Sequence, residues 1–265
     1  MQKRVLGGSK VSDTSSLKFS AQNRDVLYQV SLLQSLANGD YIGNVTIGEL
    51  KRHGDIGIGT FDRLNGEMIM LDGEVYRAAG DGRVEMVSDQ ETTPFCVATY
   101  INADETKSLK DIRSFDALGN LLNQLVTEKG VNRFYMIRID GMYREVNLRS
   151  VYAQKAPYKR LTEVMEHDQT FFDYRDIEGT LVGIYCPPYM SYLNAVGWHL
   201  HFLSKDKTKG GHVLGTDIAD AVLTWDDIDG FQMQLPQNEM FSGFDLTVDQ
   251  SDDLEKIEKG QCAGH

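Results

Sequence analysis

The stretch "GWHLHFLSKDKTKGGHVLG" (197–215) constrains the fold more than any other part of the chain. Side chains on a strand point alternately to opposite faces, so Trp198, Leu200 and Phe202 share one face while His199 and His201 share the other. Residues 205–211 are polar and end in Gly-Gly, which is typical of a turn, and an apolar strand follows. The pattern predicts an antiparallel hairpin whose apolar face belongs to a core.

This hairpin gathers three of the six histidines. If the turn is centred near Asp206 and Lys207, His212 lies roughly opposite His201, and opposed Cβ atoms are about 4.5–5.5 Å apart. His199 lies on the same face, one pleat away. A single histidine on a strand is usually a hydrogen-bonded core or surface residue. Three converging imidazoles instead suit a divalent transition metal, since catalytic zinc takes three protein ligands and keeps one position open. We therefore predict that His199, His201 and His212 bind a metal.

Composition limits the remaining possibilities. The chain has 265 residues, 41% hydrophobic and 25% charged, which is typical of a soluble globular protein. No apolar run approaches the roughly 20 residues that span a bilayer, and the first residues lack an apolar signal core, so we expect a cytoplasmic protein without a membrane partner. The net charge of −12 argues against nucleic acid as a partner, because phosphate binding needs a basic surface.

Short apolar strands dominate the chain, with helical segments at intervals and connections typical of antiparallel pairing. This pattern predicts an α+β fold of two subdomains, built on mixed or antiparallel β-sheets with flanking helices. We expect a polar N-terminal tail over 1–21 and an N-terminal sheet subdomain over 22–151. A C-terminal sheet subdomain over 152–265 would carry the metal hairpin and a C-terminal tail.

Several segments carry local expectations. Residues 24–36 have helical periodicity, as do 114–125. Residues 133–151 read as a hairpin that turns at Asp140-Gly141, by analogy with the Asp-Gly turns of type I′. A short acidic helix is expected near 252–259.

Glu67 and Arg149 are ambiguous on pattern alone. Glu67 directly follows the Asn65-Gly66 turn signal, where a charge at a hairpin end is usually solvated. Arg149 lies on an expected strand, and such an arginine usually faces water. From the residues alone, both are therefore expected at the surface.

With these pieces in order, the sequence resembles the alpha-acetolactate decarboxylases. The resemblance rests on "GIGTFDRLNGEMIMLDGEVYR" (57–77), "RFYMIRIDGMYREVNLRSV" (133–151), "EGTLVGIYCPPYM" (178–190) and "GWHLHFLSKDKTKGGHVL" (197–214). These stretches keep the order and spacing of the family over nearly the whole chain after the N-terminal tail. The combination of GxHxHF, GGHVL and GTFDxLxGE is specific.

The resemblance implies a zinc enzyme that converts the anionic (S)-2-acetolactate to (R)-acetoin and carbon dioxide through a zinc-stabilised enediolate. It implies that the zinc ligands are His199, His201 and His212, that Glu67 and Arg149 belong to the catalytic site, and that the site lies in a cleft between the two subdomains. A homodimer is commonly found in the family and is expected here.

A second site glutamate near the C-terminus is also implied, in a pattern such as I-x-x-x-E. Counting from Ile257 puts Gln261 at that position, whereas counting from Leu254 puts Glu258 there. We choose Glu258, because a glutamine cannot pass protons.

Two other readings stay open. A cupin-type enzyme also uses His-x-His and a distant histidine, but usually with a glutamate a few residues after the pair, which "HLHFLSKDKTK" lacks. A non-catalytic metal-binding or small-ligand protein is the other alternative. Structural zinc sites are closed by four protein ligands and often use cysteine, and the three cysteines lie far from the hairpin in sequence.

Overall fold

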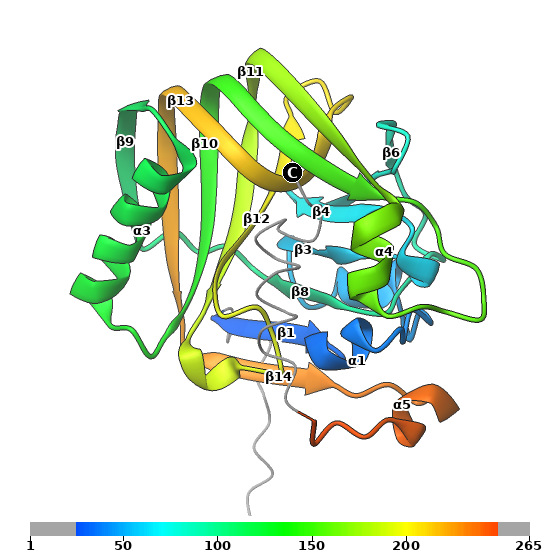
Figure 1. Ribbon diagram of the computed structural model, residues 1–265. Helices are drawn as coiled ribbons and strands as arrows, with labels where there is room; N and C mark the ends of the chain where they lie inside the picture. The colour runs from blue at the N-terminus through cyan, green and yellow to red at the C-terminus, as the bar shows by residue number, and fades with distance from the viewer. Residues whose placement is uncertain (1–24, 249–265) are drawn as a thin grey trace, which may run out of the picture.

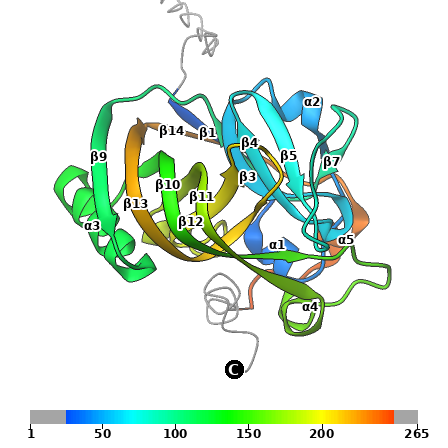
Figure 2. The same ribbon diagram turned by 90° about the horizontal axis from the view of Figure 1, so that it is seen from above.

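The computed structural model describes residues 25–248, which form two β-sheets that face each other, with short helices at their edges (Figures 1 and 2). The expected α+β class is confirmed. None of the described helices is long and apolar enough to cross a membrane. The predicted tail over 1–21 and the acidic helix near 252–259 lie outside the described residues.

The first sheet has seven strands in the order β14-β1-β8-β3-β4-β5-β6. Only the pairing of β1 with β14 is parallel, so the sheet is mixed. Its strands are β1 (Val26–Val30), β3 (Ile56–Thr60), β4 (Glu67–Leu71), β5 (Glu74–Ala78), β6 (Val84–Met86), β8 (Cys96–Thr99) and β14 (Gly230–Gln234). A separate two-stranded sheet joins β2 (Val45–Thr46) and β7 (Thr92–Thr93).

The second sheet is antiparallel, in the order β10-β11-β12-β13-β9. Because β10 also pairs with β13, the strands from β10 to β13 close on themselves, and β9 extends one side. These strands are β9 (Glu105–Ile112), β10 (Phe134–Val151), β11 (Gln169–Cys186), β12 (Gly197–Ser204) and β13 (Gly210–Ile228).

The helices lie at the edges of the sheets. In Figure 1, α3 covers the side of the second sheet near β9 and β13, and α4 lies near the far end of β10 and β11. Their bounds are α1 (Leu33–Ala37), α2 (Ile47–Leu50), α3 (Phe115–Lys129), α4 (Leu161–His167) and α5 (Glu239–Gly243), with 3-10 turns η1 (Asp62–Leu64) and η2 (Pro188–Met190). The N-terminus of α3 is capped by Ser114, whose side chain accepts a hydrogen bond from the amide of Ala117.

Apolar side chains from both sheets form the core between them. Ile58 and Ile69 of the first sheet pack in one cluster with Met136, Ile184 and Leu203 of the second. A second cluster fills the space between the second sheet and α3, including Leu118, Leu122 and Phe202. This shared cluster packs the two sheets against each other, so side chains from one sheet can contact side chains from the other.

Sheet membership divides the chain differently from the expected units 22–151 and 152–265. The strands β9 and β10 precede residue 152 but belong to the second sheet, and β14 returns to the first. The reason is the length of β10, which needs β11 and β13 as partners along its two edges.

Two local expectations are wrong. Residues 24–36 are not one helix: Val26–Val30 is a strand between β14 and β8, and only Leu33–Ala37 is helical. Apolar spacing in a fully buried strand does not distinguish it from a helix.

The Asp140-Gly141 pair is not a turn, since β10 runs straight through it. Gly141 pairs with Ala221, and a Cβ at Gly141 would lie 2.3 Å from the carbonyl oxygen of Asp220. The glycine therefore allows close strand packing. By contrast, Asp72-Gly73 does turn, with φ values of 54° and 79° that suit a type I′ hairpin.

Candidate metal centre and its pocket

Strand register explains how three functional side chains come to lie in one row. On β13, His212 pairs with His201 of β12 on one edge and with Arg149 of β10 on the other. Directly paired residues project from the same face of a sheet. His199, two residues before His201, shares that face. The predicted pairing of His201 with His212 is confirmed.

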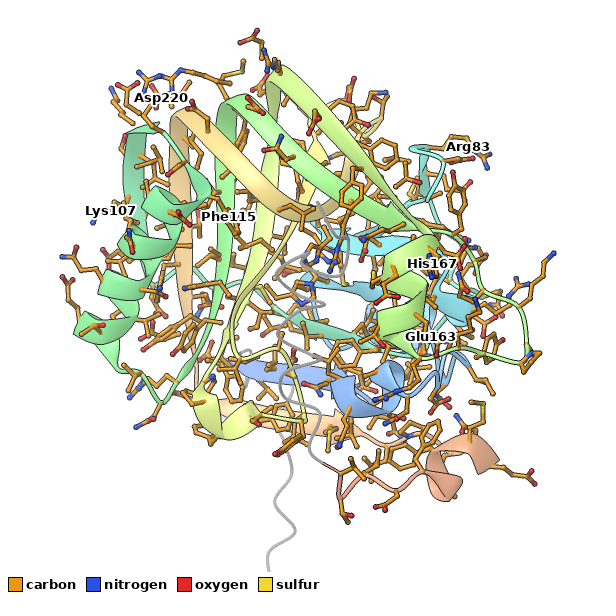
Figure 3. All side chains as sticks on the ribbon, in the orientation of Figure 1. Arg83, Lys107, Phe115, Glu163, His167 and Asp220 are labelled. Carbon is orange, nitrogen blue, oxygen red and sulfur yellow. The ribbon has the colours of Figure 1, made fainter. Side chains whose placement is uncertain are left out.

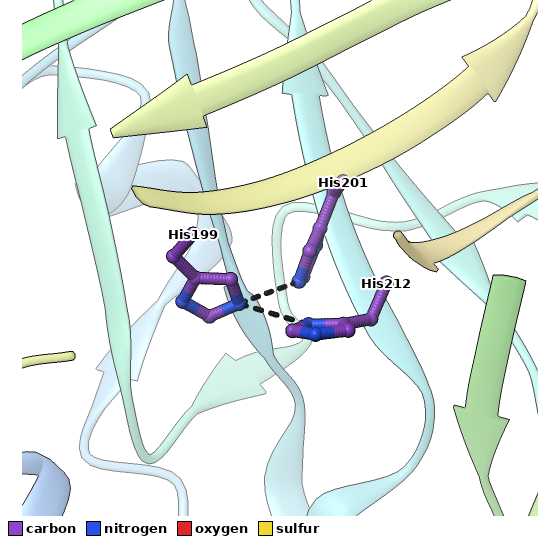
Figure 4. Close-up of side chains that lie close together, drawn as sticks. All are labelled: His199, His201 and His212. Carbon is purple, nitrogen blue, oxygen red and sulfur yellow. Dashed lines mark hydrogen bonds between the residues drawn. The ribbon is translucent and has the colours of Figure 1, made fainter. Parts of the chain in front are cut away.

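The three imidazoles converge on one point (Figure 4). Nε2 of His199 lies 3.1 Å from Nε2 of His201 and 3.1 Å from Nδ1 of His212. A tetrahedral zinc with bonds of about 2.0–2.1 Å holds its ligand nitrogens about 3.3 Å apart. Both distances are therefore close to the spacing that one small cation requires, and the three residues form a group able to hold a metal.

The environment keeps the imidazoles of His199 and His201 neutral. Burial lowers the pKa of His199 to about 3, and the charge of Arg149 adds to this shift. Burial also lowers the pKa of His201 well below its ordinary value. Neutral imidazole is the form that binds a metal. The residues thus fit a divalent cation by position and by protonation state.

A backbone carbonyl from the other sheet orients His201. Its Nδ1 lies 2.7 Å from the carbonyl oxygen of Met68 on β4. A carbonyl only accepts hydrogen bonds, so Nδ1 carries the proton and Nε2 keeps its lone pair for a ligand. This contact was not foreseen, because it depends on how the two sheets pack and leaves no pattern in the sequence.

Glu67 is buried, contrary to the expectation from pattern alone. It begins β4, is 8% exposed, and its Oε2 lies 3.5 Å from Nε2 of His201. The meeting of the two sheets covers the hairpin end that would otherwise be solvated. The first sheet thus supplies a carboxylate next to the histidines of the second.

Arg149 is buried too, at 2% exposed, although an arginine on a strand was expected to face water. Its Nε and Nη1 have no hydrogen-bond partner among the described residues. Unsatisfied buried donors are costly, about 1–3 kcal/mol each, so such an arginine points to an anionic ligand. A guanidinium binds a carboxylate with two parallel hydrogen bonds.

A pocket joins these groups. Glu67, Arg149, His199 and His212 lie on its wall. The remaining lining is mostly apolar and comes from α1, β3, η1, α4 and the residue before β8: Leu33, Leu36, Gly59, Thr60, Leu64, Leu161, Met165 and Phe95. Both sheets contribute, which agrees with a site between them. An apolar wall with a few polar groups is typical of small-molecule sites.

Glu258 and its alternative Gln261 lie outside the described residues. The described chain ends at Val248, whose carbonyl accepts a hydrogen bond of 2.7 Å from Nε2 of Gln34. Gln34 is flanked in α1 by Leu33 and lies close in sequence to Leu36, both of which line the pocket. Val248 therefore lies beside α1, the helix whose Leu33 and Leu36 line the pocket.

Comparisons with known proteins identify the family of the chain. The family model described as alpha-acetolactate decarboxylase matches residues 27–248. An alpha-acetolactate decarboxylase of Methanosarcina mazei is 40% identical over 89% of this chain and 81% of its own length. One of Bacillus licheniformis is 36% identical over 83% of this chain and 86% of its own.

The fold agrees as well. The crystal structure of alpha-acetolactate decarboxylase from Bacillus subtilis strain 168 has a TM-score of 0.84 to this chain, at 32% sequence identity, covering 90% of this chain and 100% of that one. Family model, relatives and solved structure agree over nearly the same residues. The chain therefore belongs to the alpha-acetolactate decarboxylase family, whose members are carboxy-lyases.

Proposed function

We propose that this chain decarboxylates (S)-2-acetolactate to (R)-acetoin and carbon dioxide, with a zinc ion bound by His199, His201 and His212. One observation carries the proposal: three imidazoles converge beside a buried arginine, two of whose donors have no partner among the described residues. Because the chain belongs to the alpha-acetolactate decarboxylase family, we do not pursue the cupin alternative. A non-catalytic binding protein would not be expected to bury a carboxyl group and a guanidinium in the same pocket wall as His199 and His212.

A zinc ion at the three histidines would supply Lewis acidity, which stabilises the electron pair left on the substrate when carbon dioxide departs. Its protein ligands number three, which leaves a position open for substrate oxygen. His201 is held in the correct tautomer by the Met68 carbonyl. Other divalent ions also accept imidazole ligands, and zinc is proposed from the family resemblance.

Arg149 would bind the substrate carboxylate. Its Nε and Nη1 are buried donors without a partner among the described residues, and a guanidinium can donate two parallel hydrogen bonds to a carboxylate. This holds the anion against the overall charge of −12. It also fixes the orientation of the carbon–carbon bond that breaks, with its electron pair staying on the hydroxyketone fragment.

Glu67 and Glu258 would manage the proton that replaces carbon dioxide, and Glu67 is also a candidate for metal ligation. A proton donor must lie within reach of the bound substrate, and Glu67 is buried in the pocket wall beside His201. Delivery of the proton from one fixed side would give one acetoin enantiomer.

The length of chain between Val248 and Glu258 is compatible with a role for Glu258 in the pocket. Glu258 lies ten positions beyond Val248, which corresponds to about 15 Å as a helix and at most about 33 Å as an extended chain. Val248 itself is bonded next to the pocket lining. Glu258→Gln should therefore lower turnover or the enantiomeric purity of acetoin. Full activity and unchanged chirality, together with a loss in Gln261→Ala, would move the role to position 261.

Racemic 2-acetolactate is the direct test of the reaction. The zinc-loaded protein should release acetoin and carbon dioxide and form one enantiomer, resolved by chiral gas chromatography. No turnover by the folded, zinc-loaded protein would contradict the proposal. A cytoplasmic location and a homodimer also stay proposals, and light scattering on the eluting protein tests the dimer.

A further inference from the structure

A second, larger chamber lies on the other side of His199 and His212. It has a volume of about 530 Å³, within the range of about 300–1,000 Å³ that is common for small-molecule sites. It is bounded by α3, by the segment 191–197 and by β12 and β13. The same two histidines line the pocket with Glu67 and Arg149, so the two spaces meet at the metal ligands.

The strand pairing explains why the chamber exists. The strands β12 and β13 are paired only between His201–Leu203 and Gly210–His212. Before His201 and after His212 they separate, and α3 covers the gap. Figure 3 labels Phe115, at the start of α3, which packs against the core of the second sheet and also lines the chamber.

The chamber differs in charge from the pocket. Among the described residues, no aspartate, glutamate, lysine or arginine lines it. Leu118, Leu122, Leu200 and Val213 make most of the wall apolar, and Asn123 adds a polar group. Moving an ion into such a wall without a partner is strongly unfavourable. The lining therefore selects uncharged molecules, whereas the substrate anion matches Arg149.

Gly119 keeps this space open. It lies inside α3 and lines the chamber, and a Cβ built on it meets no atom of the described residues within 4 Å. A glycine inside a helix costs about 1 kcal/mol relative to alanine, and it is usually explained by close packing. Within residues 25–248 no neighbour lies that close to Gly119. The missing side chain instead leaves volume beside the metal ligands.

We propose that this chamber binds a small uncharged molecule of the alcohol or hydroxyketone class, in contact with His199 and His212. Its apolar wall holds the carbon skeleton, and Asn123 offers a hydrogen bond to one oxygen. The neutral product of the proposed reaction belongs to this class. That link to the reaction rests on the proposed function, whereas the binding site does not.

Trp198 provides a direct readout. It lines the chamber, and the chain has only one other tryptophan, Trp225, which is fully buried. Metal-free and zinc-loaded protein should be titrated with cyclohexanol and with acetoin, following tryptophan fluorescence and the thermal unfolding midpoint. Both neutral probes should bind saturably and raise the midpoint. Isobutyrate, a charged probe of similar size, should bind the metal-free protein at least tenfold more weakly at this site.

A graded series at one position tests the location. Gly119→Ala should keep the binding and stabilise α3, so it is the control. Gly119→Leu should weaken binding, and Gly119→Phe should weaken it at least tenfold. If the phenylalanine variant does not fold, the leucine variant alone tests the location. Equal affinity across the folded variants, or no saturable binding to wild type, would overturn the proposal. Binding without decarboxylation would refute only the proposed function.

Discussion

Replacing Arg149 by methionine should make the metal-free protein more stable and the enzyme nearly inactive. Nε and Nη1 of Arg149 are buried without hydrogen-bond partners among the described residues. Each unsatisfied donor costs about 1–3 kcal/mol. Methionine has a similar length and no donors, so the unfolding free energy of the metal-free variant should rise by about 1–3 kcal/mol, after allowing for imperfect packing.

The same donors set the expected loss of activity. A hydrogen bond to a charged group contributes about 1.5–3 kcal/mol, so losing two of them at the substrate carboxylate removes about 3–6 kcal/mol. That corresponds to a fall in kcat/KM of about 10²- to 10⁴-fold. Arg149→Lys keeps the charge but loses the two-pronged geometry, and it should fall between wild type and the methionine variant.

Arg138 is the matched control because it lies on the same strand. Its guanidinium donates to Asp72 at 2.5 Å and to Asp140 at 2.6 Å, and it lies outside the pocket. Arg138→Met should therefore lose a little stability and keep its activity. Urea unfolding of the metal-free proteins and acetoin formation by the zinc-loaded ones give both quantities. An Arg149→Met variant that is less stable than wild type and fully active would refute the reasoning.

Three further results are expected. Burial, together with the negative charges of Asp104 and Asp25, raises the pKa of Asp226 to about 7. The protonated form of Asp226 therefore contributes stability that is complete below about pH 4 and is lost as the pH rises through 7. Asp226→Asn should be more stable than wild type at pH 8 by about 2–4 kcal/mol and show a smaller difference at pH 4; urea unfolding at both pH values checks this, and an equal difference would contradict it. Glu67→Gln should reduce turnover at least tenfold, and it should weaken zinc binding if Glu67 is also a ligand, as measured by competition with a chelator. His212→Ala should keep its circular dichroism spectrum but not retain one zinc per chain after gel filtration; full zinc retention would exclude His212 as a ligand.

Local alternation was enough to predict the metal hairpin. Residues 197–215 contain both strands and their turn, so the pairing of His201 with His212 follows from the sequence. The position of Arg149 beside His212 does not follow from the sequence pattern. It depends on β10 running straight through Asp140-Gly141 to pair with β13, and that dipeptide resembles a turn. Here the resemblance to the family, and not the pattern, proposed Arg149 as a site residue.

Burial of Glu67 could not be read from its own segment either. A charge after Asn65-Gly66 looks like an exposed hairpin end, and only the packing of β4 against the second sheet covers it. The strand at 26–30 was missed for a related reason, since buried strands lose the alternation that distinguishes them from helices. Contacts between distant elements account for both errors.

The central claim is that His199, His201 and His212 hold a catalytic metal beside Arg149. The most direct measurement removes the metal with a chelator, adds zinc back in steps, and follows acetoin formation together with circular dichroism. Activity should vanish with the fold kept, and it should return linearly up to one zinc per chain. Activity that survives complete metal removal would contradict the claim. Loss of the fold on chelation would instead identify a structural metal.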